Sequence, residues 1–151
     1  MTRRFPMRYY MAIDSNPLAS LPLALFGVGS ESAYVDLLQD KLMVRVGNLF
    51  NETFSLSELG RGERFSWPWF YGLGVRTDFQ GLVGAVTSTQ GVVAIPLLQE
   101  KTLFIPLLGP LGLQVPCKKL VFSLKDPDTF LANFNQGRPE VNGAPKNVVI
   151  E

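Results

Sequence analysis

Residues 66–74, SWPWFYGLG, contain both tryptophans of the chain. The aromatic cluster is Trp67, Trp69, Phe70 and Tyr71, with Arg64 and Arg76 as flanking cations. Such rings bind apolar groups and stack with guanidinium groups. In an extended segment successive side chains face opposite ways, so the four rings cannot all point inward. Two interpretations stay open: packing in the core or at its rim, and a groove or self-association patch.

Residue types that commonly carry catalysis are scarce. The chain has no histidine, which excludes Ser-His-Asp and Cys-His catalysis. Its single cysteine, Cys117, cannot form an internal disulfide or a zinc site, and we interpret it as a small apolar filler. Carboxylate, lysine or hard-metal chemistry remains, but no set of residues stands out as catalytic, metal-ligating or cofactor-binding.

The charge balance bears on partners. Fourteen basic and thirteen acidic residues give a net charge of +1, so we expect no nucleic-acid partner. Residues 17–29 form the most hydrophobic stretch and superficially resemble a signal peptide. The stretch is too short to cross a hydrocarbon layer about 30 Å thick, so we expect no integral membrane segment. We interpret it as a packed N-terminal segment and expect a cytoplasmic protein, with an export signal as the alternative.

Short β-rich runs separated by turn residues dominate the first half. Residues 8–13 resemble a first strand. Residues 34–38 and 41–46 predict a hairpin around Gln39 and Asp40, with Leu42, Val44 and Val46 facing inward. The next segment, LFNETFSL, fits a helix or a strand.

The second half mixes strands with prolines. Runs near 82–88 and 92–97 flank Gln90 and Gly91, which predicts a tight hairpin. Residues 102–116 carry three prolines, and we expect an apolar loop there. A strand with Leu120, Phe122 and Leu124 on one face should follow.

A short amphipathic helix should close the fold. Asp126 is a good N-cap, Pro127 suits the first turn, and Gly137 can end the helix. Phe130, Leu131 and Phe134 form its apolar stripe. Together these elements predict a mainly β fold, a small barrel or bent antiparallel sheets, whose open end the helix covers.

The order of these features resembles a family of uncharacterised bacterial proteins, abundant in actinobacteria, that look similar to pleckstrin-homology domains. The resemblance rests on Phe26-Gly27-Val28, the aromatic cluster before Gly72, the glycine-led strand at Gly91 and the closing strand–Asp-Pro–helix. It implies one pleckstrin-homology-like barrel domain over residues 7–136, without enzymatic activity. Residues 137–151 mix Pro, Gly and charge, and we expect them to form a mobile tail. Family members have adjacent tryptophans where this chain has Trp67-Pro68-Trp69.

The sequence thus leads to a functional hypothesis. We expect a non-enzymatic binding or interaction module that contacts a protein, a small apolar ligand or its own symmetry mate through the aromatic cluster. Phosphoinositides are unsuitable ligands, because the first hairpin loop, Gln39-Asp40-Lys41, has one cation. The alternative is an enzyme of unfamiliar type using carboxylates or a hard metal.

Overall fold

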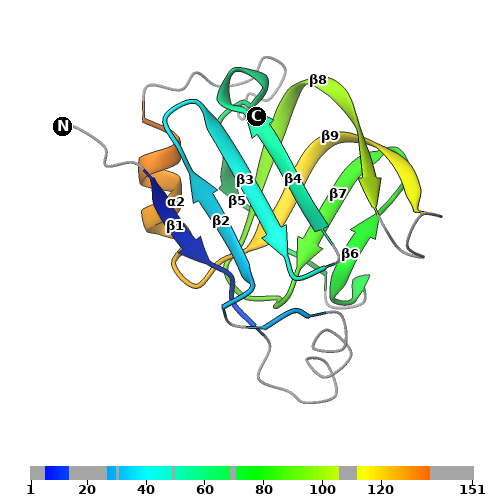
Figure 1. Ribbon diagram of the computed structural model, residues 1–151, viewed down its shortest axis with the longest axis horizontal. Helices are drawn as coiled ribbons and strands as arrows, with labels where there is room; N and C mark the ends of the chain where they lie inside the picture. Colours follow the sequence, from blue (N-terminus) through cyan, green and yellow to red (C-terminus); the bar gives the residue numbers. More distant parts are fainter. Residues whose placement is uncertain are drawn as a thin grey trace.

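The computed structural model describes residues 6–13, 27–29, 31–48, 50–68, 71–105 and 112–136, and these form two β-sheets and a short C-terminal helix (Figure 1). The first sheet is an antiparallel meander in the order β1-β2-β3-β4. Its strands are β1 (Met7–Tyr10), β2 (Ala33–Leu37), β3 (Lys41–Val46) and β4 (Phe50–Ser55). The segment left open between helix and strand is therefore strand β4.

The second sheet has five strands in the order β5-β8-β9-β7-β6. They are β5 (Glu63–Arg64), β6 (Gly74–Thr77), β7 (Gly81–Val86), β8 (Val92–Ile105) and β9 (Leu113–Ser123). Neighbours are antiparallel except β7 and β9, which run parallel. A 3₁₀ helix, η1 (Leu56–Glu58), follows β4, and helix α2 (Pro127–Phe134) follows β9.

The predicted class is confirmed in its coarse form: mostly β, with two sheets and one short C-terminal helix. The described strands do not close into a barrel, and the parallel pair departs from the expected antiparallel sheets. Asp126 caps α2 by accepting a hydrogen bond from the Thr129 amide, as predicted. Phe130 and Phe134 are fully buried and Leu131 is partly buried. Gly137, the tail 137–151 and residues 17–26 of the apolar stretch lie outside the described residues.

The predicted hairpin between residues 82–88 and 92–97 is wrong, because β9 lies between β7 and β8. The segment that connects β7 to β8 is hydrogen-bonded to the end of β9. The Thr87 amide donates to Ser123 Oγ at 3.0 Å, and the Leu124 amide donates to the Gly91 carbonyl at 2.8 Å. These tertiary bonds replace the local β7–β8 pairing that the turn residues suggested.

The expected apolar loop at 102–116 is also wrong in part. Strand β8 extends to Ile105, β9 begins at Leu113, and only residues 106–111 between them lie outside the described residues. Pro116 is opposite Thr102 within the ladder. Parallel pairing of β9 with β7 begins one residue later, at Cys117. Pro116 has no N–H to donate, but it lies before this ladder, so no hydrogen bond to β7 is lost.

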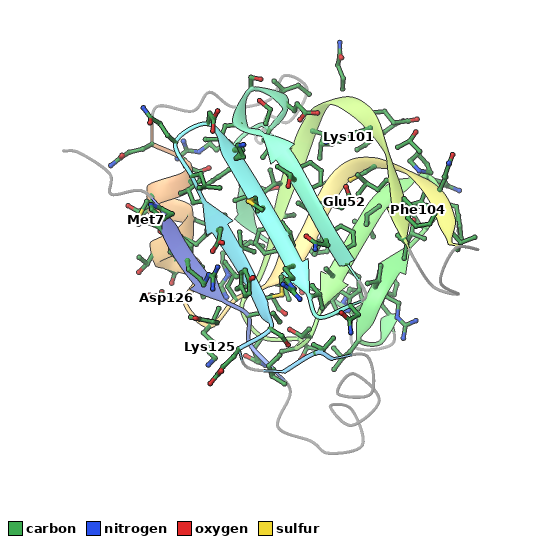
Figure 2. All side chains as sticks on the ribbon, viewed as in Figure 1. Met7, Glu52, Lys101, Phe104, Lys125 and Asp126 are labelled. Carbon is green, nitrogen blue, oxygen red and sulfur yellow. The ribbon has the colours of Figure 1, made fainter. Side chains whose placement is uncertain are left out.

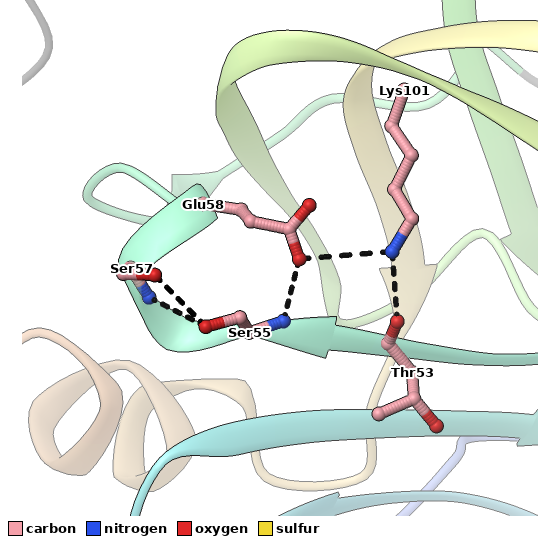
Figure 3. Close-up of polar contacts among 5 residues, drawn as sticks. All are labelled: Thr53, Ser55, Ser57, Glu58 and Lys101. Carbon is pink, nitrogen blue, oxygen red and sulfur yellow. Dashed lines mark hydrogen bonds and ion pairs between the residues drawn. The ribbon is translucent and has the colours of Figure 1, made fainter.

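The two sheets share one hydrophobic core and are joined at two places. Near β1, Met11 forms a bridge with Leu124. Near β4, the Lys101 ammonium donates to the Thr53 carbonyl at 3.0 Å and lies 3.6 Å from the Glu58 carboxylate, which also completes the Ser55 capping box (Figure 3). Helix α2 seals the core, where the Phe130 ring packs edge-on against Phe122 of β9.

Candidate binding site around Trp67

The segment after β5 crosses the outer face of the five-stranded sheet. Its Phe65 amide donates to the Val92 carbonyl at 2.9 Å, and the Trp67 side chain is only 6% exposed. Beneath Trp67 lies a second hydrophobic cluster, separate from the shared core; this outer cluster consists of Trp67, Val86, Val92, Ala94 and Val121. The packing interpretation therefore holds for Trp67.

Gly84 of β7 makes room for the indole ring. A Cβ atom on Gly84 would lie 2.9 Å from Trp67 Cη2, a distance that real Cβ atoms essentially never show. The indole Nε1 donates to the Gly72 carbonyl at 2.9 Å. The Tyr71 ring stands edge-on to the indole, with centroids 5.2 Å apart and planes at 85°. Trp67 is thus fixed in position and orientation.

Trp67 lines two hollows. The first has a volume of about 270 Å³ and is lined by Trp67, Tyr71, Arg76, Thr77, Asp78 and Leu82. The second, about 450 Å³, is lined by Arg64, Phe65, Ser66, Trp67, Thr89, Gln90, Gly91 and Val92. We call the first the Trp67 cleft. Its walls combine apolar surface with one cation, Arg76, and one carboxylate, Asp78.

The predicted site residues divide between these hollows. Tyr71, 46% exposed, and Arg76 join Trp67 at the Trp67 cleft. Arg64 instead lines the second hollow, and its guanidinium lies 3.1 Å from the Asp128 carboxylate of α2. Trp69 and Phe70 lie outside the described residues. The structure therefore brings three of the six predicted residues together.

The sequence interpretation missed the β6–β7 hairpin beside the cleft. Phe79 at its tip is 61% exposed and has φ of 59°, the one positive φ at a non-glycine residue within the described ranges. Asp78 Oδ1 accepts the amides of Gln80 at 2.8 Å and Leu82 at 3.0 Å. These bonds lower the pKa of Asp78. The Asp78-to-Gly81 sequence was the available turn signal.

Other groups with altered pKa values lie away from this cleft. Burial raises the pKa of the Cys117 thiol to about 12, which fits the predicted apolar filler. Burial also raises the pKa of Glu52, which lies on β4 beside Phe104 of β8 (Figure 2). Among the described residues, no three His, Cys, Asp or Glu side chains gather as a metal site.

Comparisons with known proteins give no assignment: no family model, no curated protein and no solved structure matches the chain. No helix in the described ranges is long and apolar enough to span a membrane. The chemistry of the site itself therefore carries the functional argument. The Trp67 cleft offers a rigid apolar wall with a charge of each sign, an arrangement suited to holding an apolar group.

Proposed function

We propose that this chain is a non-enzymatic interaction module that binds its partner through the Trp67 surface, which we define as the Trp67 cleft together with Phe79. The observation that carries the proposal is Phe79, a large apolar side chain that is exposed while its backbone is in the left-handed region. A bulky residue is rarely found in that region. The expected role of Phe79 is contact with a partner.

Strain of this kind costs on the order of 1–3 kcal/mol, and such residues cluster at binding sites. Internal packing does not offset it, because most of the Phe79 side chain faces solvent. A glycine or asparagine would fit the same turn without that strain. The presence of phenylalanine is therefore better explained by binding than by folding.

The cleft beside Phe79 supports an apolar ligand group with polar surroundings. Leu82 and Trp67 provide apolar wall, and Arg76 stands at the same cleft. Preformed clefts of this composition bind by excluding water from a hydrophobic group while a few polar atoms fix its orientation. A small apolar ligand or an apolar side chain of a protein partner fits this description.

The resemblance to pleckstrin-homology domains belongs to the same proposal. Two sheets with a helix packed at one end of the core support it, and the parallel β7–β9 pair departs from it. A cytoplasmic location in a bacterium is proposed with it, supported by the free thiol of Cys117. The enzyme alternative has no supporting group of metal ligands among the described residues.

A fluorescence titration with 8-anilinonaphthalene-1-sulfonate, an anionic aromatic probe, tests the proposal. We expect saturable binding that Leu82→Ser weakens and that the matched variant Leu98→Ser, on an exposed leucine of β8, leaves unchanged. Arg76→Gln should weaken binding of this anionic probe more than it weakens binding of the uncharged probe N-phenyl-1-naphthylamine. Absence of saturable binding, or equal loss in both leucine variants, contradicts the proposal.

A further inference from the structure

Strand β6 forms one border of the five-stranded sheet (Figure 1). Its one pairing partner among the described strands is β7. The Asp78 amide donates to the Leu82 carbonyl of β7 at 3.4 Å, and Arg76 is paired with Gly84. In an antiparallel ladder the backbone groups of successive residues point to alternate sides. The N–H and C=O groups of Val75 and Thr77 therefore point away from β7, toward a side where no described strand pairs with β6.

The other border strands are either contacted by neighbouring segments or very short. Beside β4, Lys101 of β8 donates to the Thr53 carbonyl. Beside β1, the Lys125 amide donates to the Tyr10 carbonyl at 3.1 Å, and Asn133 of α2 donates to the Tyr9 hydroxyl at 2.8 Å. Strand β5 is two residues long. Of the described borders, β6 is the one suited to accept another strand.

The charged residues at the end of β6 would complement those of a second copy of the strand. Arg76 and Asp78 lie two residues apart, on the same face, with Thr77 between them. If a second β6 runs antiparallel with Thr77 opposite Thr77, Arg76 of each strand stands opposite Asp78 of the other. This register also pairs the outward backbone groups of the two Thr77 residues, as an antiparallel ladder requires.

We propose that the partner of the Trp67 surface is a second copy of this chain, joined by antiparallel β6–β6 pairing centred on Thr77, with reciprocal Arg76–Asp78 ion pairs. This inference rests on the proposed function, because it names the partner of the same surface. It gives a two-fold symmetric dimer with one continuous sheet across both copies.

The neighbouring side chains fit this arrangement. Within the described residues, no carboxylate lies within ion-pair distance of Arg76. Asp78 uses Oδ1 for its turn bonds, and a carboxylate has further acceptor sites for a guanidinium. Phe79 follows Asp78 directly, so the register brings its exposed ring toward Val75 of the partner. Burial of that ring in the dimer accounts for its exposure in one chain.

Sedimentation velocity over a series of protein concentrations tests this dimer. We expect the wild type to convert from monomer to dimer as concentration rises. Arg76→Asp and Asp78→Lys should each weaken dimerisation by about tenfold or more, since two opposite-charge pairs become like-charge pairs. An equimolar mixture of the two variants should recover a heterodimer, because one ion pair returns between the unchanged Arg76 and Asp78 and the other returns with its charges exchanged. Failure of the mixture to associate overturns the inference.

A backbone test does not depend on Asp78, whose replacement also removes turn bonds. Thr77→Pro removes the outward N–H and the hydroxyl, which accepts the Phe79 amide at 3.0 Å. The matched control Thr77→Val removes the same hydroxyl and its turn bond but keeps the outward N–H. We expect the proline variant to stay monomeric and the valine variant to dimerise, with circular dichroism verifying that both fold. Equal dimerisation of the two variants contradicts β6 pairing.

The two proposals fail in different ways. A wild type that stays monomeric at all concentrations, yet binds the anionic probe in the Leu82-dependent manner, overturns the dimer and leaves the proposed function standing. A monomer that shows no such binding overturns both.

Discussion

The two sheets use their faces differently. In the four-stranded sheet Leu42 and Val44 enter the shared core, while Lys41 and Met43 of the same strand are exposed. In the five-stranded sheet the first part of β8 is covered on both faces: Val93 and Ile95 enter the shared core, and Val92 and Ala94 enter the outer cluster. The Trp67 cleft lies where a segment without regular structure covers the second face. A sheet with side chains packed on both faces can thus support a cleft on its outer face. A sheet whose outer face is exposed lacks this support.

The largest expected effect concerns the core that the two sheets share. Phe134→Ala should lower the free energy of unfolding by about 3–5 kcal/mol, because the ring is fully buried beside Phe130. Urea denaturation followed by circular dichroism measures it. A loss below about 1 kcal/mol would mean that α2 is peripheral to both sheets.

The second prediction separates the outer faces of the two sheets. Gly84→Ala should destabilise by about 1–3 kcal/mol, because the added methyl group meets the Trp67 ring. Met43→Ala, on the exposed face of the four-stranded sheet, should change stability by less than about 0.5 kcal/mol. Chemical denaturation of both variants provides the comparison, and similar values would erase the distinction between the faces.

The third prediction is a gain in stability instead of a loss, and it tests backbone strain at Phe79 of the Trp67 surface. Phe79→Asn should stabilise the monomer by about 1 kcal/mol, since asparagine tolerates the left-handed conformation. Thermal unfolding at low protein concentration measures this without a contribution from association. Phe104→Asn is the control: that phenylalanine is exposed in strand β8, and its replacement should give no gain. Loss of stability in Phe79→Asn would show that its ring packs within one chain.

The smallest expected effect lies where the sheets meet near β4. Burial raises the pKa of Glu52 above its value in the unfolded chain, so the folded state binds the proton more tightly. The charged Glu52 therefore disfavours folding at neutral pH, and this penalty fades as pH falls through the folded and then the unfolded pKa. Glu52→Gln should be more stable than wild type at neutral pH, with a difference that shrinks in acid.

Asp78 of the second sheet supplies the contrasting case for that measurement. Hydrogen bonds lower its pKa, so its stabilising contribution is present above the unfolded pKa and is lost as pH falls through the folded pKa. Asp78→Asn should be less stable than wild type at neutral pH and approach it in acid. Denaturant titrations at several pH values give both curves, and parallel pH profiles for wild type and Glu52→Gln would refute the burial argument.

The β2–β3 hairpin was predictable because its pattern is local. Val44 and Val46 alternate with polar neighbours, and a short turn joins the two strands. Strand β4 was open between helix and strand, and β1 pairs with β2 across the long segment between Tyr10 and Ala33. Helix α2 was equally visible, since its Asp126 cap and its two buried phenylalanines are close in sequence. Such elements can be predicted from the local sequence without knowing which distant segments pack against them.

The five-stranded sheet was hidden because its order depends on distant partners. Runs such as Val92 to Ile95 are apolar on both faces and show no alternation. No local pattern indicates that β9 separates β7 from β8, because this order follows from the pairing of β9 with both strands. At the site, the aromatic cluster drew attention to Trp67, but its burial depends on Gly84 seventeen residues later, and the strain at Phe79 is a backbone property.

The junction near Met11 bears on how the chain assembles. The Ala12 amide donates to the Ser123 carbonyl at 3.3 Å, and the Thr87 hydroxyl donates to the Ala12 carbonyl. Contacts between residues so far apart in sequence make folding slow relative to helical proteins. During synthesis the meander can pair as soon as it leaves the ribosome, but its inner face has no cover until the final strand emerges. Until then the apolar inner face of the meander is exposed to solvent, and exposed apolar surface of this kind is prone to aggregation.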